Sequence, residues 1–241
     1  MALRSIPVVW LLLSGVLLSC GCASPDPQPA ATDARSQPVA AAQPASKTTD
    51  EDADRPRIIF LGDSLTAGLG LDLDRSFPAL VQERLRAEGF DYTVVNAGVS
   101  GDTSAGGLRR LEWALGEGTP RVLIVALGGN DGLRGLPPSE LEKNLAAIID
   151  EGKGRGLAVI LAGMEAPPNY GPEYTREFRE TYRTLARRFD VPLIPFLLQG
   201  VAGDSSLNQP DGIHPNERGA RIVAENVWRV LQPVLEKNRL S

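Results

Sequence analysis

Hydrophobic positions beyond residue 56 alternate between short continuous apolar runs and longer stretches with an apolar residue every three or four positions. Continuous apolar runs are typical of strands buried on both faces. The predicted strands span 57–61, 92–96, 121–127, 157–161 and 191–195. The wider spacing is typical of helices with one buried face, and Ser139 is the expected N-cap of one of them. The predicted helices span 77–88, 104–115, 138–153, 173–189 and 216–236.

The regular alternation of strands and helices predicts an α/β fold. We expect a three-layer α/β/α domain around a five-stranded parallel sheet in the flavodoxin-like order. Ligands bind to such folds beyond the carboxyl ends of the strands, where the strand order reverses. In this order that point lies between the first and third strands, and the turns after these strands carry Ser64 and Asn130. A functional site containing both residues is therefore expected there.

The first nineteen residues predict a signal peptide, because Arg4 is followed by an apolar run at 6–18 that is too short to span a membrane comfortably. The run ends in a sequence that resembles a bacterial lipobox and predicts lipidation of Cys20. Cys22 is a second option with less suitable residues before it, and an ordinary signal peptide is a third. Gly21 is not the aspartate expected for inner-membrane retention, which favours the outer membrane.

Residues 20–56 are rich in Pro, Ala and Asp and almost free of large apolar side chains. Such a segment buries too little apolar surface to offset its ordering entropy, so we expect a disordered linker between a membrane and the domain at 57–241. This organisation predicts export to the cell envelope or periplasm, with a lipid anchor in the outer membrane.

Composition restricts the partners and cofactors. The formal net charge is −5, and no basic stripe is present, so a nucleic acid is not expected as a partner. Both cysteines lie before the folded domain and the chain has a single histidine, so neither a metal site nor a cofactor is expected. A monomer is expected.

Four polar or Gly-rich turns carry candidate chemistry. The single histidine, His214, follows Asp211 by three residues, a spacing that is also common in surface and capping positions. Ser64 could cap a helix or bind a phosphate such as that of a flavin, and Thr66 stands where a Gly-x-Ser-x-Gly nucleophile elbow needs glycine. Each turn is a weak signal when taken alone.

In this order the turns resemble the four blocks of the GDSL family, also called the SGNH-hydrolase superfamily of lipases and esterases. The matching residues are Gly62-Asp63-Ser64-Leu65, Gly101, Asn130, Asp211 and His214. The sequences around Gly101 and Asn130 are most similar to a bacterial subgroup of arylesterases, thioesterases and lysophospholipases. The resemblance implies Ser64 as nucleophile, with Asp211 and His214 completing a triad. It also implies an oxyanion hole formed by Ser64, Gly101 and Asn130.

The expected activity is hydrolysis of acyl esters through an acyl-enzyme, on aryl esters, lysophospholipids and possibly thioesters. A carbohydrate or cell-wall O-acetylesterase of the same superfamily is the alternative. Two other classes stay open: a flavin- or phosphate-binding module, and a lipoprotein that binds lipid without catalysis. An acyl pocket is expected from Pro168, Tyr170, Phe196 and Leu197, all on loops after strands.

Asp63 and Asp131 are interpreted as structural carboxylates rather than reacting groups. Each follows or precedes a residue of a candidate block, in a turn after a strand. Aspartate side chains in such turns commonly accept hydrogen bonds from nearby backbone N–H groups. We therefore expect both side chains to stabilise turns beside the site.

Overall fold

The computed structural model describes residues 55–116 and 118–239. The predicted signal peptide, Cys20 and nearly all of the predicted linker lie outside the described residues and stay predictions. Among the helices of the described part, none is long and apolar enough to cross a membrane.

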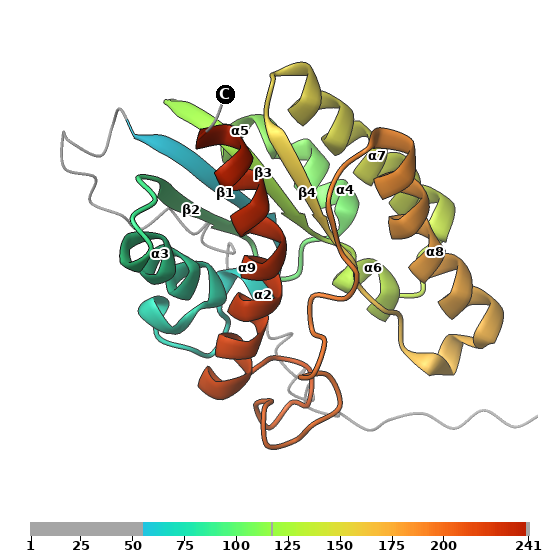
Figure 1. Ribbon diagram of the computed structural model, residues 1–241. Helices are drawn as coiled ribbons and strands as arrows, with labels where there is room; N and C mark the ends of the chain where they lie inside the picture. Colours follow the sequence, from blue (N-terminus) through green and yellow to red (C-terminus); the bar gives the residue numbers. More distant parts are fainter. Residues whose placement is uncertain (1–54, 117, 240–241) are drawn as a thin grey trace, which may run out of the picture. The chain divides into compact units, whose positions relative to one another are not determined.

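The centre of the domain is a five-stranded parallel sheet in the order β2-β1-β3-β4-β5 (Figure 1). The strands are β1 (Pro56–Gly62), β2 (Thr93–Gly98), β3 (Thr119–Ala126), β4 (Ala158–Ala162) and β5 (Leu193–Ile194). All five were predicted, and the flavodoxin-like order is confirmed. Because β1 and β3 are neighbours from which the chain proceeds in opposite directions across the sheet, their carboxyl ends form the switch point.

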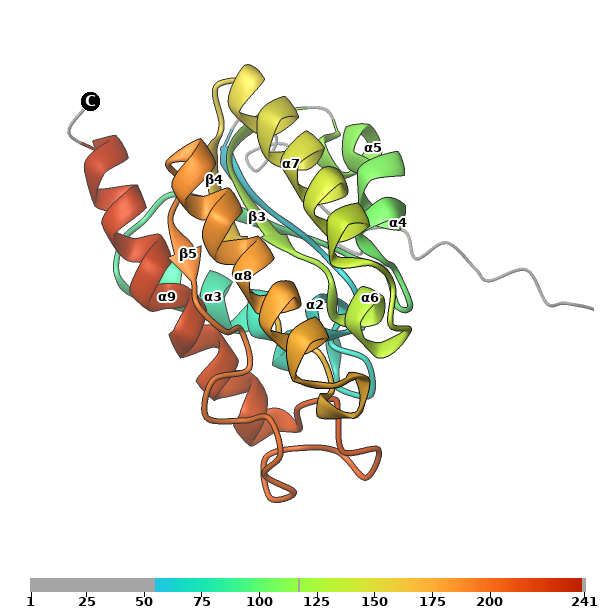
Figure 2. The ribbon, with the colours of Figure 1, turned by 90° about the vertical axis from the view of Figure 1, so that its right-hand side faces the viewer.

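Helices cover both faces of the sheet (Figures 1 and 2). On one face, α3 packs against α9, and α9 contacts β4 and β5. On the other face, α7 packs against both α4 and α8, and α5 contacts β1. The ranges of these helices are α3 (Phe77–Ala87), α4 (Ser104–Arg109), α5 (Leu111–Leu115), α7 (Pro138–Gly154), α8 (Pro172–Phe189) and α9 (Glu217–Arg239). The three-layer α/β/α architecture is therefore as predicted.

The core lies between these layers and follows the predicted apolar patterns. The central strands carry the runs 58–61 and 122–125, in which every side chain is fully buried. Helix α7 contributes Leu141, Leu145 and Ile148 from a single face. Burial of such continuous apolar surface on both sides of the sheet supplies the main driving force for folding.

Two local predictions differ from the structure. The helix expected at 104–115 is divided at Arg110, whose backbone leaves the helical region at φ −108° and ψ 11°. Ser139 does not cap α7: the cap position is Pro137 and Pro138 begins the helix. Proline suits the first position of a helix because its missing N–H would have no helical partner there. Ser139 consequently lies one residue inside the helix.

Short helical segments that the periodicity did not predict follow three of the strands. Helix α2 (Ser64–Ala67) follows β1, α6 (Gly129–Leu133) follows β3, and the 3₁₀ turn η2 (Pro168–Tyr170) lies between β4 and α8. A further 3₁₀ turn, η1 (Leu73–Arg75), precedes α3. These segments are too short for their apolar spacing to be recognised. They occupy the edge of the sheet where the predicted site lies.

Candidate active site

Close backbone packing at the carboxyl ends of β1 and β2 places Ser64. Helix α2 begins at Ser64, two residues after Gly62, and crosses the end of β2. A Cβ atom on Gly62 would lie 1.9 Å from Thr66 Oγ1, and one on Gly98 would lie 2.3 Å from the Ala67 nitrogen. Only glycine at both positions lets the helix approach the sheet this closely. Ser64 is thereby fixed at the edge where ligands bind in this fold class.

Asp63 forms the N-terminal cap of α2 and is almost completely buried, with 3% of its surface exposed. Its Oδ1 atom accepts a hydrogen bond of 3.0 Å from the Leu65 N–H. Burial raises the pKa of Asp63 to about 6, against the smaller lowering effects of the Leu65 N–H and of the positive charge of His214. The expected structural role of this carboxylate is confirmed.

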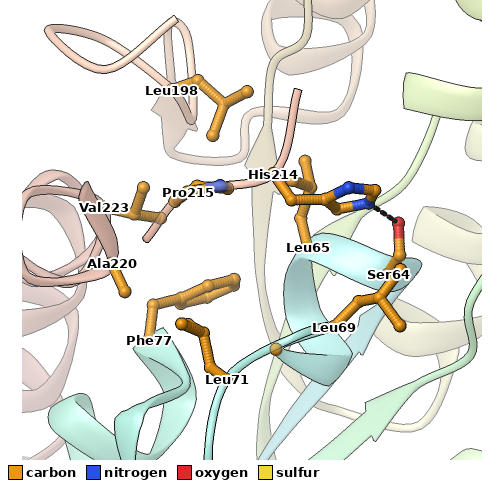
Figure 3. A pocket seen from close by; sticks show the side chains of 11 residues that line it. Ser64, Leu65, Leu69, Leu71, Phe77, Leu198, His214, Pro215, Ala220 and Val223 are labelled. Carbon is orange, nitrogen blue, oxygen red and sulfur yellow. Dashed lines mark hydrogen bonds between the residues drawn. The ribbon is translucent and has the colours of Figure 1, made fainter. Parts of the chain in front are cut away.

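Ser64, His214 and Asp211 form a continuous chain of side-chain contacts. His214 Nε2 lies 2.8 Å from Ser64 Oγ, the contact drawn in Figure 3, and His214 Nδ1 lies 2.7 Å from Asp211 Oδ2. These distances allow Nδ1 to donate its proton to the carboxylate while Nε2 accepts the serine proton. The arrangement can therefore convert a weakly nucleophilic hydroxyl into an attacking group.

The carboxylate of Asp211 is stabilised by its own loop. The N–H groups of His214 and Ile213 each donate a 3.0 Å hydrogen bond to Asp211 Oδ1. Together with the His214 ring, these donors lower the pKa of Asp211 to about 2. Hydrogen bonds to a carboxylate favour its charged form. Asp211 therefore stays ionised throughout the neutral range and holds the Nδ1–H of the histidine.

Gln209 connects the histidine loop to the segment after α2. Its side-chain amide donates to Leu69 O at 2.7 Å and to Pro215 O at 2.9 Å, and its backbone N–H donates to His214 O at 2.7 Å. These contacts fix the ring of His214 relative to the helix that carries Ser64. Sequence reasoning missed this residue, because nothing in its local pattern distinguishes it from an ordinary loop glutamine.

Three hydrogen-bond donors lie near the ends of β1, β2 and β3. The Asn130 side-chain amide in α6 donates to Asp102 O at 2.9 Å and lies 3.4 Å from Asp63 Oδ2. Gly101 has φ +83°, a conformation that favours glycine, and Arg134 donates to its carbonyl oxygen at 2.9 Å. Within the described residues, neither the Ser64 N–H nor the Gly101 N–H donates to a protein acceptor. Both N–H groups are thus free to bind an oxygen of a ligand.

Arg110 holds the ends of two strands and the loop that contains Gly101. Its guanidinium donates to Ala97 O and Gly62 O, each at 2.7 Å, and pairs with Asp102 at 2.5 Å. The turn of the backbone at Arg110 directs this side chain toward the sheet, which explains why one predicted helix becomes two. Sequence reasoning missed Arg110, since the two carbonyls that it bonds belong to strands earlier in the chain and no local motif connects them to this residue.

Asp131 supports the neighbouring α6 segment. It accepts hydrogen bonds from the Ser104 N–H at 2.8 Å and from Ser104 Oγ at 2.5 Å, and Asn144 donates to the same hydroxyl at 3.0 Å. The structural role expected for Asp131 is confirmed. No group of three or more His, Cys, Asp or Glu side chains able to hold a metal ion occurs within 55–116 and 118–239.

A cavity of about 530 Å³ opens beside Ser64 and Asn130. Much of its wall is apolar, and large side chains reach it from α6, from η2 and from the loops around them: Leu133, Met164, Pro168, Phe196, Leu198 and Ile213. Pockets of this size and character accommodate small organic ligands. Of the four residues expected to form an acyl pocket, Pro168 and Phe196 line it.

The other two residues expected in the pocket lie elsewhere. Leu197 is 1% exposed and belongs to the core, while its neighbours Phe196 and Leu198 line the cavity from a turn in which the Gln199 N–H donates to Phe196 O. Tyr170 does not line the cavity either, since its hydroxyl turns to donate to Leu133 O at 2.9 Å on the outer surface. For these two residues, the expected place in the pocket is wrong.

A second, much smaller cavity lies behind the Ser64–His214 contact (Figure 3). Its volume is about 10 Å³, and its wall includes Leu71, Phe77 and Val223 from the η1–α3 region and α9. This space admits about one water molecule and no larger ligand. The apolar wall instead supports the face of the histidine loop that is turned away from the large cavity.

Comparisons with known proteins identify the family. Residues 60–222 match the GDSL-like lipase/acylhydrolase family. The chain is 47% identical to esterase TesA of Pseudomonas aeruginosa over 178 residues, which cover 74% of this chain and 89% of that protein. It is 39% identical to thioesterase 1/protease 1/lysophospholipase L1 of Escherichia coli over 178 residues, covering 74% and 84% of the two chains.

Solved structures show the same fold. A crystal structure of TesA superimposes with a TM-score of 0.71 at 46% sequence identity, covering 73% of this chain and 98% of the other. The match of the family spans most of the domain, including the ends of β1 and β3 and the histidine loop. This chain belongs to the GDSL-like lipase/acylhydrolase family and is a carboxylic ester hydrolase.

Proposed function

We propose that this enzyme is a serine esterase in which Ser64 is the nucleophile, His214 the general base and Asp211 the residue that orients the histidine. The observation that carries the proposal is the chain of contacts from Ser64 Oγ through both ring nitrogens of His214 to Asp211 Oδ2, at 2.8 and 2.7 Å. His214 is the single histidine of the sequence, so no other imidazole can take the serine proton.

The proposed reaction has two steps. Ser64 Oγ attacks the carbonyl carbon of the ester while its proton passes to His214 Nε2, and the tetrahedral intermediate then expels the alcohol, which receives that proton. Water attacks the resulting acyl-enzyme with the same base, and the acid leaves as Ser64 regains its proton. Asp211, ionised at neutral pH, stabilises the imidazolium that forms in each step.

The oxyanion of each tetrahedral intermediate would be bound by the Ser64 and Gly101 N–H groups and the Asn130 side-chain amide. The two backbone donors have no acceptor within the described residues, which supports this role. The Asn130 amide is oriented by Asp102 O. One pre-oriented donor of this kind contributes about 3 kcal/mol to lowering the barrier.

The proposed substrates are acyl esters with an apolar acyl or aryl group, including aryl esters, lysophospholipids and thioesters. The 530 Å³ cavity with its largely apolar wall supports this class, because an acetyl group alone would leave most of it empty. The names of the relatives, which include an esterase and a thioesterase/lysophospholipase, point the same way. We further propose that the enzyme is an exported monomer, anchored through Cys20 to the outer membrane.

The test is a panel of p-nitrophenyl esters from acetyl to palmitoyl, together with a lysophospholipid and an acyl thioester. We expect the full chain to hydrolyse medium and long acyl esters, Ser64→Ala and His214→Ala to lose nearly all turnover, and Ser205→Ala, which changes an exposed serine, to retain it. Near-normal turnover by either of the first two variants would overturn the assignment. A strict preference for acetyl esters would favour an O-acetylesterase instead.

A further inference from the structure

Two exposed apolar side chains line the large cavity, and two more lie beside residues of its wall. Leu69, Leu133, Tyr170 and Ile213 are between 40% and 47% exposed and come from four separate segments. Leu133 and Ile213 line the cavity, and the Tyr170 hydroxyl is bonded to Leu133 O. Leu69 adjoins Ser64 (Figure 3), and Gln209 bonds its backbone to the histidine loop. We call these four residues the apolar rim.

The concentration of such residues at one opening distinguishes the rim from scattered surface leucines. Isolated exposed apolar side chains are normal, whereas several around one opening mark an interaction site. Trp113 is also exposed, at 51%, but it lies beside Arg57 at the amino end of β1, at the opposite edge of the sheet. Trp113 therefore serves as a control position that is exposed but distant from the rim.

We propose that the apolar rim inserts into the surface of a phospholipid bilayer and that the mouth of the active site thereby faces the membrane. The inference rests on the proposed function, since a lipid ester could then pass from the bilayer into the cavity without crossing water. Four partly exposed side chains bury too little surface to hold a protein on a membrane by themselves, so a second attachment is required.

The amino-terminal segment supplies that second attachment in the proposed anchored protein. Residues 21–54 separate Cys20 from the first described residue, Arg55. The linker predicted from composition would, at that length, have a root-mean-square span of roughly 30 Å, which gives the domain a high effective concentration of membrane surface. A weak contact that is negligible for a free protein is then populated.

The amino-terminal segment joins the domain at a position from which the anchor alone cannot orient the active site toward the membrane. The chain enters at the amino end of β1, whereas the rim lies at the carboxyl end of the sheet. The seven residues of β1 rise about 23 Å, and the fully extended segment reaches about 115 Å, so it can pass around the domain. The anchor alone does not determine which end faces the lipid, and the rim does.

Charge near the rim selects the kind of lipid. Asp211 is adjacent to this surface and stays ionised, with 46% of its side chain exposed, and Glu165 lines the cavity. Arg179, which pairs with Glu165 at 3.0 Å, and Arg134 are basic neighbours that balance these carboxylates, and the formal net charge of the chain is −5. A surface without excess positive charge gains nothing from anionic headgroups. We therefore infer that the surface recognised is zwitterionic phospholipid, bound by apolar insertion with little dependence on salt.

A fluorescent label tests the insertion directly. The full chain carrying Cys22→Ser is reconstituted in phosphatidylcholine vesicles, with an environment-sensitive label on Leu69→Cys or, as the matched control, on Trp113→Cys. We expect a blue shift at position 69 and quenching by doxyl-labelled lipids at least twofold stronger than at position 113. Equal spectra and equal quenching at the two positions would overturn the proposal.

The same samples separate this inference from the proposed function and from self-association. Hydrolysis of a water-soluble p-nitrophenyl ester reports on the catalytic site alone. If the protein hydrolyses this ester but does not insert, only the docking surface is overturned. If it inserts but does not hydrolyse the ester, only the esterase assignment is overturned. A blue shift that depends on protein density and not on doxyl lipid would assign the rim to a second copy of this chain and overturn the membrane proposal.

Discussion

Two carboxylates near Ser64 lie in opposite environments, and this difference separates their roles. Asp63 is buried with a pKa raised to about 6, while Asp211 is half-exposed with a pKa lowered to about 2 by the N–H groups of its own loop. A residue that must stabilise a positive ring has to be ionised at working pH. Asp211 meets this requirement. Asp63 instead caps helix α2, where ionising its buried carboxyl costs free energy.

Asp63→Asn should change the pH dependence of stability. The pKa of Asp63 is raised from 3.8 to about 6 on folding. The contribution of this carboxyl to folding stability is therefore greatest below pH 3.8 and is lost as the pH rises through 6. Relative to wild type, the variant should gain roughly 2 kcal/mol between pH 4 and pH 8. Urea unfolding at both pH values measures the difference, and any constant effect of the altered contacts cancels. If the free energies of unfolding of the two proteins changed equally between pH 4 and pH 8, the raised pKa of Asp63 would be contradicted.

Asp211→Asn should reduce turnover far more than it reduces stability. The asparagine cannot accept the Nδ1–H in the same way as a carboxylate and favours the other tautomer of His214, in which Nε2 carries the proton. We expect kcat to fall about 10³- to 10⁴-fold with a small change in KM. Steady-state kinetics on a p-nitrophenyl ester measures both constants. A fall of less than tenfold would show that Asp211 does not orient the histidine.

At the scale of elements, the ends of β1, β2 and β3 are held together by a few long-range hydrogen bonds. Arg110 bonds the last carbonyl of β1 and the penultimate carbonyl of β2, and its partner Asp102 accepts the Asn130 amide through its backbone. The proposed oxyanion donors therefore depend on one ion pair whose side chains are 15% and 18% exposed.

Arg110→Met should destabilise this edge. The change leaves the largely buried Asp102 carboxylate without its partner, and two backbone carbonyls lose donors, which costs about 2–4 kcal/mol. Urea unfolding measures this loss, and kcat should fall with it because Asn130 loses its orientation. The control is Arg155→Met, which removes exposed pairs with Glu112 and Glu151 and should change stability little. Equal effects of the two variants would contradict the structural role of Arg110.

Element prediction succeeded where the pattern is long and failed where a tertiary contact competes. The apolar periods of β1, β3 and α7 are maintained over whole elements, so their existence could be read from the sequence. The helix at 104–115 is divided because Arg110 turns toward backbone carbonyls of the sheet. Helices α2 and α6 are one turn long and depend on the strands that they cover.

At the scale of the whole molecule, the proposed anchor and the domain have distinct functions: one supplies proximity to a membrane and the other the chemistry. The anchor lies outside the described residues, so its test is chemical rather than structural. Cys20 and Cys22 provide a matched pair, because they are separated by a single glycine.

Cys20→Ser should abolish lipidation of the chain in a bacterial host, whereas Cys22→Ser should leave it intact. A lipoprotein acquires its acyl chains on the cysteine at the cleavage site, and these chains hold it to the bilayer without spanning it. Incorporation of radiolabelled palmitate into the full chain measures this difference. Equal labelling of both variants, or no labelling of wild type, would contradict the proposed anchor.

The sequence by itself determined the fold class, the edge of the sheet that carries the site, and the residues that meet there. The fold class and the edge follow from apolar periods, which are local properties of the chain, and the residues follow from ordered polar turns that resemble the blocks of the GDSL family. Tertiary structure alone decided which side chains line the cavity, how Arg110 and Gln209 hold the site, and why the pKa values of Asp63 and Asp211 diverge. Burial of Asp63 and the contacts of Arg110 and Gln209 involve residues far apart in sequence. The N–H groups that lower the pKa of Asp211 are local, but they converge on the carboxylate only once the loop has folded.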